Sequence, residues 1–320
     1  MVNIKIYNDA LHEGLWFQEL CPDLLKDAEL VTINRRGNNP KIIDELISYD
    51  RPDIILTVND VPKLVLEKTT EVPTGHNIGQ RVGRIVKAAE HKVPAITFLP
   101  FDALKHGKFA GMCNLNIRLL DAFLNMTKIH EIPILAMNWS ADEDGELVRD
   151  DSQDKKLAML LHDFITNDFN SNIDAFNSQL DYMQKEYDLR LLRKKSYGAP
   201  PKSVEIIPTK DFISKYAKKL KNYESKILKN TSTLVYTMDM KPEKCRREDP
   251  YTGMQFVYDY QHCRIGAKPE EKEVNLVLYI PQVTIELWSN NNPNDELRKS
   301  CLWYKTANLI MLKDSIIHLR

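Results

Sequence analysis

The sequence predicts an α/β fold with a mixed central sheet flanked by helices. Three observations lead to this prediction. Two apolar runs, 54–58 and 64–66, are rich in Ile, Leu and Val, which is typical of strands buried on both faces. Asn59 and Asp60 lie between the runs, where a hairpin needs residues that form a tight turn. Apolar residues over 78–90 then repeat with the spacing of a helix that packs against a sheet.

The other elements of the first half follow from the same patterns. We expect strands at 2–7, 28–33, 93–99 and 132–137, and helices at 11–20, 41–49 and 115–128. The helix at 41–49 starts after Pro40, at a position where proline is favoured. The polar, strongly acidic stretch 140–154 then indicates a boundary.

The second half is expected to contain a mostly helical middle and an α+β C-terminal part. Residues 155–195 are almost wholly helical in pattern and fit a pair of packing or dimer helices. A break at 197–201 precedes an amphipathic, lysine-rich helix over 211–229. Strands are expected at 234–238, 273–279 and 284–288. The predicted domains are therefore 1–140, 141–199 and 200–320.

Composition and charge fit an ordinary globular chain. Of the 320 residues, 43% are hydrophobic and 28% charged, and no run approaches the roughly 18 apolar residues of a membrane span. The five scattered cysteines include no CxxC pair, and the N-terminus has no signal-peptide pattern, so we expect a cytoplasmic protein with reduced thiols. The net charge is −1, but residues 140–188 are rich in acids and 200–247 rich in bases, which favours a local electrostatic footprint.

Two acids are expected at one end of the central hairpin. Asp53 precedes its first strand and Glu67 ends the second. In an antiparallel hairpin these positions lie at the same end of the ladder, so the two carboxylates can converge. Two carboxylates at one point are hard oxygen ligands suited to Mg²⁺. The other interpretation is that both are ordinary strand-end acids.

These residues resemble a known family. Pro52-Asp53, followed after a hairpin by Glu67-Lys68-Thr69, is similar to the PD-(D/E)xK nuclease superfamily, which includes many restriction endonucleases. The resemblance implies a restriction endonuclease-like core over 1–140, with the order α, β, β, β, α, β. It implies that Asp53 and Glu67 bind the metal. The lysine of the family pattern is Thr69 here, and Lys68 points to the opposite face of a regular strand.

The resemblance also implies roles for neighbouring residues. Thr69 would orient a water, and Glu71, Gln80 and the early helical Glu13 are possible helpers. The alternative for Glu13 is an ordinary surface glutamate, which is the favoured interpretation. Near the helix start, Arg81 and Gln80 are placed to bind phosphate, and Arg84 continues the polar stripe; a solvent-facing stripe is the alternative. The proposed catalytic set comprises Asp53, Glu67, Thr69, Glu71 and Gln80, and the proposed DNA contacts are Arg81, Arg84, Arg246, Arg247 and Arg264.

Two stretches near the C-terminus bear on recognition. Residues 245–264 combine Arg, Tyr and Gln, the types that contact base edges and sugars, which places DNA recognition there. Cys245, His262 and Cys263 could instead suggest zinc, although no CxxC pair or fourth ligand accompanies them.

The sequence thus predicts a Mg²⁺-dependent endonuclease that hydrolyses double-stranded DNA, similar to a Type II restriction enzyme and expected to be a homodimer. The alternative is a catalytically inactive DNA-binding or regulatory protein on the same fold, which the absent lysine favours. A small-molecule enzyme of Rossmann type has little support, because no Walker loop, dinucleotide glycine pattern or nucleophile elbow is present.

Overall fold

The computed structural model describes residues 2–34, 37–73, 81–108, 110–150, 152–193, 202–220, 228–238, 274–290 and 307–318. The chain forms two compact units. Unit 1 comprises Met1–Asn77 and Arg84–Lys195, and unit 2 comprises Ile78–Gly83 and Ser196–Arg320. In these described ranges, no helix is long and apolar enough to cross a membrane.

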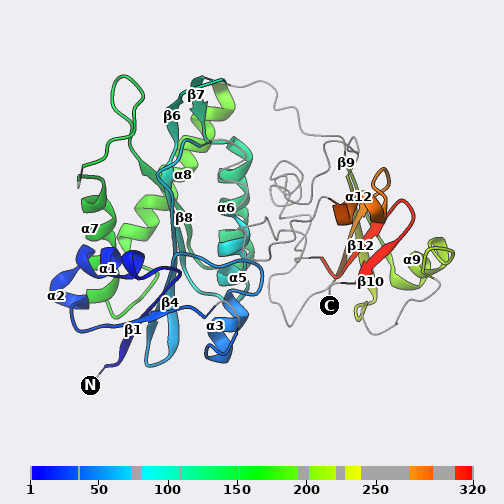
Figure 1. Cartoon of the computed structure of the whole chain (residues 1–320), viewed down its shortest axis with the longest axis horizontal. Helices are drawn as coiled ribbons and strands as arrows, with labels where there is room; N and C mark the ends of the chain where they lie inside the picture. The colour runs from blue at the N-terminus through cyan, green and yellow to red at the C-terminus, as the bar shows by residue number, and fades with distance from the viewer. Residues whose placement is uncertain are drawn as a thin grey trace. The chain divides into compact units, whose positions relative to one another are not determined.

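Unit 1 contains a sheet with helices on either side (Figure 1). Its strands are β1 (Ile4–Asn8), β2 (Glu29–Thr32), β3 (Ile54–Val58), β4 (Val61–Lys68), β5 (Ala95–Pro100), β6 (Asp102–Lys105), β7 (Gly111–Asn114) and β8 (Ile134–Trp139). Its helices are α1 (Leu11–Leu20), α2 (Pro22–Leu25), α3 (Lys41–Leu46), α5 (Gly83–Glu90), α6 (Ile117–His130), α7 (Ser152–Thr166) and α8 (Asp174–Arg193).

The main sheet of unit 1 has six strands in the order β2-β1-β3-β4-β5-β8, and β6 and β7 form a separate hairpin. The pairs β1–β2, β4–β5 and β5–β8 are parallel, whereas β1–β3 and β3–β4 are antiparallel. Figure 1 shows α1 and α7 on one side of this sheet and α5 and α6 on the other. The predicted α/β class with a mixed, helix-flanked sheet is confirmed.

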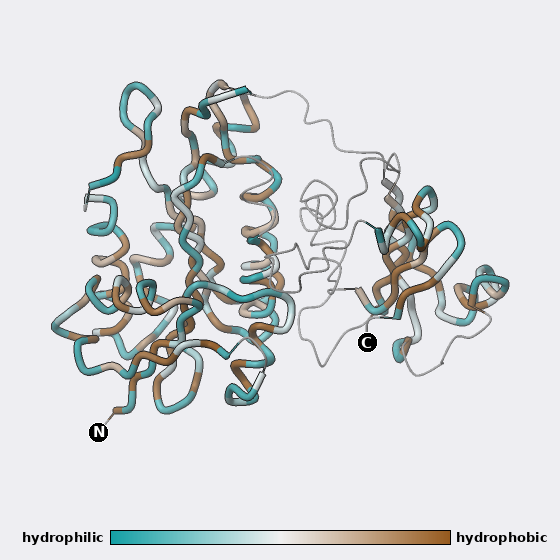
Figure 2. Tube along the Cα trace, in the orientation of Figure 1, coloured by the Kyte–Doolittle hydropathy of each residue, from teal (hydrophilic) through white to brown (hydrophobic). Residues whose placement is uncertain are grey.

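The central hairpin forms as predicted. All residues of β3 are buried, and in β4 the segment from Leu64 to Glu67 is buried, so both strands lie in the interior. Asn59 and Asp60 have φ values of 49° and 62°, so both turn residues adopt the left-handed conformation of a type I′ turn. Figure 2 shows hydrophobic residues gathered along these central strands.

The strand beside β3 is not the one that precedes it in the chain. Strand β1 pairs with β3, and β2 lies at the edge of the sheet. The burial of the strands gives the reason. The C-terminal half of β1 is buried, whereas both ends of β2 are exposed, so β1 is the better neighbour for a fully buried strand.

The helix after the hairpin is shorter than predicted. It was expected from Ile78, but Arg81 and Val82 have turn conformations and α5 begins at Gly83. Because β4 and β5 are parallel, the chain must cross back along the sheet between them, and α5 lies in this crossover.

The helices over 152–193 belong to unit 1. Helix α7 packs against α1, and α8 packs against α6 and β8. The acidic stretch 140–154 is therefore not a boundary between compact units, which the structure places near residue 195. It contains instead a bridge between Ala141 and Leu147.

Unit 2 contains a five-stranded sheet in the order β13-β12-β11-β10-β9. Its elements are β9 (Lys202–Pro208), α9 (Thr209–Lys215), β10 (Ser232–Met238), β11 (Val274–Ile280), α12 (Ile285–Asn290), β12 (Leu309–Leu312) and β13 (Ile316–His318). The middle strands are parallel, and each outer strand is antiparallel to its neighbour.

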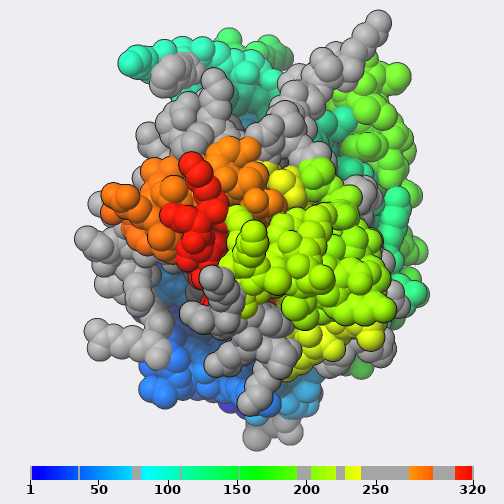
Figure 3. All heavy atoms as spheres, turned by 90° about the vertical axis from the view of Figure 1, so that its right-hand side faces the viewer, coloured from blue at the N-terminus to red at the C-terminus, as the bar shows by residue number. Residues whose placement is uncertain are grey.

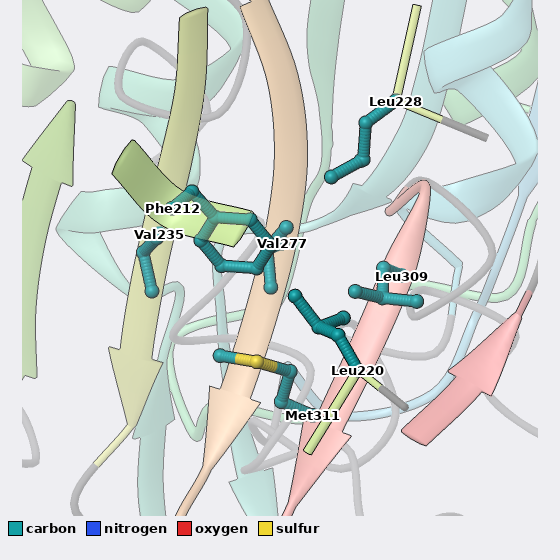
Figure 4. Packing of buried hydrophobic residues seen from close by; sticks show 7 residues of the cluster. All are labelled: Phe212, Leu220, Leu228, Val235, Val277, Leu309 and Met311. Carbon is teal, nitrogen blue, oxygen red and sulfur yellow. The ribbon is translucent and has the colours of Figure 1, made fainter. Parts of the chain in front are cut away.

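An apolar cluster packs on this second sheet. Figure 4 shows its side chains, contributed by α9, by the three middle strands and by the residues near 220 and 228. The members are Phe212, Leu220, Leu228, Val235, Val277, Leu309 and Met311. Figure 3 shows three of the segments of this unit, 202–220, 274–290 and 307–318, beside one another on one face.

Two predictions for unit 2 are wrong in detail. The expected strand 284–288 is the helix α12, because Thr284 and Asp314 accept hydrogen bonds from its first N–H groups. The expected helix 211–229 ends at Lys215. The expected strands at 234–238 and 273–279 are confirmed as β10 and β11.

Candidate active site

Asp53 and Glu67 face one another at one end of the central hairpin. Ile54 pairs with Leu66, so the residues just outside this pair lie opposite each other, as the sequence predicted. Glu67 has no exposed surface, and Asp53 is 5% exposed. The Asp53 Oδ2 atom accepts a hydrogen bond of 2.7 Å from the Lys68 backbone N–H, which fixes the orientation of this carboxylate across the hairpin.

The guanidinium group of Arg84 lies between these two carboxylates. Its Nη1 atom is 2.5 Å from Glu67 Oε1 and 3.5 Å from Asp53 Oδ1. Its Nε atom donates to Asp50 Oδ2 at 3.2 Å. Arg84 is in the first turn of α5 and is only 3% exposed, so it is an internal cation with three acidic partners.

Burial and charge oppose one another in this cluster. Burial lowers the pKa of Arg84, but the charges of Glu67 and Asp50 outweigh burial, so the pKa is raised overall and the guanidinium stays charged. Burial raises the pKa of Asp50, and Arg84 only partly offsets that rise. The positive charge of the arginine therefore offsets part of the cost of burying these carboxylates.

A second ion pair adjoins this corner of the sheet. Arg51 Nη1 lies 3.1 Å from Asp9 Oδ1, and the Asp9 backbone N–H donates to the Asp53 carbonyl at 3.0 Å. Among the residues that the structure describes, the carboxylates of Asp9, Asp50, Asp53 and Glu67 therefore lie near the guanidinium groups of Arg51 and Arg84 at this corner.

The two carboxylate oxygens are suited to a divalent ion whose remaining coordination positions are filled by other ligands. Asp53 Oδ1 and Glu67 Oε1 point at one common position, now taken by the Arg84 nitrogen. Mg²⁺ is usually bound by one or two carboxylates, with water and substrate phosphates as the other ligands. The part of the chain that the structure describes contains no group of three or more His, Cys, Asp or Glu side chains that could hold a metal.

Thr69 and Glu71 are placed differently from one another. Strand β4 ends at Lys68, and Glu71, which the resemblance implied as a possible helper, lies three residues beyond this end and is exposed. Thr69 is buried beside the hairpin end, and its Oγ1 accepts a hydrogen bond of 3.3 Å from the Glu71 backbone N–H. Of the two, only Thr69 lies inside the protein next to the acid pair.

Lys68 lies on the other face of the sheet, as expected from strand alternation. Its Nζ atom is 3.7 Å from the centroid of the Trp16 ring and 5.1 Å from that of Trp139. It is also 3.8 Å from Asp154 Oδ1. The lysine next to Thr69 in sequence is therefore not the charge that the family pattern requires.

Some other predicted site residues have different surroundings. Glu13 accepts a hydrogen bond of 2.9 Å from the Ala10 backbone N–H, which places it in the cap of α1. Arg81 is half-buried in the turn before α5, and Arg84 contacts acids rather than the surface. Seven of the residues singled out from the sequence lie outside the described ranges: Gln80, Arg246, Arg247, Arg264, Cys245, His262 and Cys263.

The sequence interpretation missed the partnership of Arg84 with Asp50. The sequence did contain one indication that Arg84 is buried. Ala88 lies four residues after Arg84 and therefore on the same face of α5, and both residues are buried.

Comparison with known proteins does not assign a family. No family model matches the chain, and no curated protein or solved structure gives a significant match.

Proposed function

We propose that unit 1 is a Mg²⁺-dependent endonuclease domain that hydrolyses phosphodiester bonds of double-stranded DNA. The observation that carries this proposal is the convergence of Asp53 Oδ1 and Glu67 Oε1 on one cationic position at the end of the central hairpin. Such a site suits reactions in which phosphate oxygens complete the coordination of a metal.

The topology around the hairpin supports a restriction endonuclease-like core. Strands β1, β3 and β4 are successively antiparallel, and β5 follows parallel to β4 after α5. The run β3, β4, α5 and β5 follows the last four elements of the order α, β, β, β, α, β that the resemblance implies, although β2 precedes β3 in the chain without pairing with it.

The roles of the residues follow from their positions. Asp53 and Glu67 would hold the ion, which would lower the pKa of a bound water and stabilise charge that develops at phosphorus. The Lys68 backbone N–H holds Asp53 in orientation through Oδ2, which leaves Oδ1 directed at the site. Thr69 supplies the hydroxyl nearest to this hairpin end in sequence, and we assign it the positioning of the attacking water.

Unit 2 is proposed to recognise DNA, and the protein to act as a homodimer on a duplex. The lysines near α9 are only partly available for phosphate. Lys215 pairs with Glu205 at 2.7 Å, and Lys219 donates to the carbonyls of Leu312 and Lys313. The proposal keeps Arg246, Arg247 and Arg264 as direct DNA contacts on the basis of the sequence, and the salt dependence of DNA binding by their alanine variants tests this.

The second candidate function is DNA binding without cleavage. Two observations favour it: Thr69 replaces the expected lysine, and Arg84 already neutralises the acid pair. In that case Asp53, Glu67 and Arg84 would serve as a buried structural network.

Cleavage of mixed plasmid and phage DNA with and without Mg²⁺ decides between these two functions. Wild type should cut with Mg²⁺ or Mn²⁺ and not with EDTA, and Asp53→Asn and Glu67→Gln should each lose cleavage by at least ~10³-fold. Asp102→Asn is the matched control. Like Asp53 and Glu67, Asp102 forms an ion pair with a buried arginine, in this case Arg190, and the variant removes only its charge. Loss of cleavage in the control alone, or no cleavage by wild type on any duplex, would remove support for the nuclease.

A further inference from the structure

Arg84 makes its two contacts at the end of the hairpin through a single atom. Its Nη1 atom lies 2.5 Å from Glu67 Oε1 and 3.5 Å from Asp53 Oδ1. These are the two oxygens that would bind a metal ion. A guanidinium nitrogen and a divalent cation cannot both lie between them, because the metal–oxygen distance is only about 2.0–2.1 Å for Mg²⁺ and the two cations repel.

Arg84 has a separate anchor that does not depend on these oxygens. Its Nε atom donates to Asp50 Oδ2 at 3.2 Å, and the carboxylate of Asp50 is itself oriented by its Oδ1 atom, which accepts from the Arg51 backbone N–H at 2.8 Å. The guanidinium can therefore release the acid pair and keep a bonded partner. An arginine held only by the metal ligands would have no such alternative.

We propose that Arg84 is an internal substitute for the metal: it holds Asp53 and Glu67 together when no divalent ion is bound, and it yields them to the ion while Asp50 retains it. This inference rests on the proposed metal site. In the absence of metal, the charge of Arg84 would reduce the repulsion and the desolvation cost of the two buried carboxylates, and so would allow the protein to fold.

The proposal predicts competition between Arg84 and the metal. In wild type the ion must displace a guanidinium group from both carboxylates, which weakens its binding. In Arg84→Met the buried pair loses the positive charge of Arg84, so the apo protein should be less stable and the ion should bind more tightly. Arg84→Lys is the conservative variant. It keeps the positive charge, but its single ammonium group cannot contact Asp50 and the acid pair through two separate nitrogens as the guanidinium does.

The experiment measures thermal unfolding and calorimetric binding of Mg²⁺, Mn²⁺ and Ca²⁺ for wild type, Arg84→Met and Arg84→Lys. Arg84→Met should melt below wild type in EDTA, recover when the ion is added, and bind it at least about tenfold more tightly. Arg190→Met is the matched control: Arg190 is also buried, with Asp102 and Glu186 as partners, and divalent ions should not restore its stability.

The outcomes separate this inference from the nuclease. Equal metal affinity in wild type and Arg84→Met, together with DNA cleavage by wild type, overturns the inference and leaves the nuclease standing. Tighter binding in Arg84→Met without cleavage by wild type supports the inference and overturns the nuclease. Absence of metal binding in both proteins overturns both.

A measurement on wild type covers the case in which neither variant folds. The side-chain Nε–H signal of buried Arg84 in an NMR spectrum of ¹⁵N-labelled protein should shift when Mg²⁺ is added. The corresponding signal of Arg190 should stay in place. A spectrum in which no buried arginine signal responds to a saturating ion overturns the proposal.

Discussion

The Nζ atom of Lys68 lies 3.7 Å from the centroid of the Trp16 ring, on the face of β4 opposite to Glu67. Burial lowers the pKa of this lysine, and the charges of Asp154 and Asp53 partly offset the decrease. The Trp16 ring and Asp154 thus compensate a half-buried ammonium group on the face of the sheet opposite to Glu67.

Lys68→Met should leave DNA cleavage within about threefold of wild type, because the charge that it removes acts in a partly exposed pair on the other face of the sheet. The methionine keeps an apolar stem over the Trp16 ring. Initial rates of plasmid nicking, compared with those of Glu67→Gln, measure the effect. A hundredfold loss in Lys68→Met would mean that the lysine reaches the site from a rearranged strand end.

Thr69→Val should slow cleavage by ~10²-fold with little change in metal affinity, because valine keeps the shape of threonine and removes only the hydroxyl that positions water. Thr69→Ser should retain most of the activity. Glu71→Gln is expected to be nearly neutral, since Glu71 is exposed beyond the end of β4. Single-turnover rates and calorimetric metal binding check all three variants. A Glu71→Gln protein as inactive as Glu67→Gln would identify Glu71 as a base or ligand.

Asp60→Val should destabilise unit 1 by about 1–2 kcal/mol, because Asp60 has a φ of 62° and β-branched residues tolerate this region poorly. Asp60→Gly should be close to neutral, since glycine suits the second position of a type I′ turn. Urea unfolding gives the free energies. Lys5→Gln separates the backbone effect from the 2.8 Å ion pair of Asp60 with Lys5, which is exposed and contributes little to stability.

Asn275→Ala should destabilise unit 2 by about 3 kcal/mol. The amide nitrogen of this fully buried residue lies within hydrogen-bond distance of the Thr209 and Thr233 hydroxyls and of the carbonyls of Asn230 and Ser232, which share its two N–H donors. Its removal leaves several of these groups buried without their donor. Hydrogen exchange in peptides from β10 and β11 reports on this unit separately. Exchange rates equal to those of wild type would show that water replaces the amide.

Cys21 should react with iodoacetamide about 100-fold more slowly at pH 8 than an ordinary thiol does, because burial raises its pKa from 9.0 to about 11 and little thiolate is present. Its reaction should accelerate as the pH rises toward 11. Mass spectrometry of labelled peptides separates Cys21 from the more exposed Cys113. Rapid labelling of Cys21 at pH 8 would mean that α1 and α2 open readily.

The hairpin could be predicted because its signals are local. Asn59 and Asp60 tolerate the left-handed conformation, and the apolar runs on either side identify buried strands. The opposition of Asp53 and Glu67 then follows from the antiparallel register alone. These features need no knowledge of the rest of the chain.

Other features depend on distant partners. The choice of β1 rather than β2 as the neighbour of β3 is decided by packing across the sheet, which the two strand sequences do not reveal. The burial of Arg84 depends on Asp50 and the acid pair, which belong to segments at least 17 residues away from it in sequence. Helix α12 depends on Asp314, which binds the Ile285 N–H from a position 29 residues further along the chain.

The turn at Asn59 and Asp60 also determines which of two adjacent residues faces α5. Because side chains alternate along β4, a slip of one residue would turn Lys68 toward Arg84 and Glu67 toward Trp16. Such a pairing would bring two cations together on one face and bury a carboxylate against indole rings on the other. The side chains of the candidate site therefore also disfavour wrong pairing of the hairpin while the chain folds.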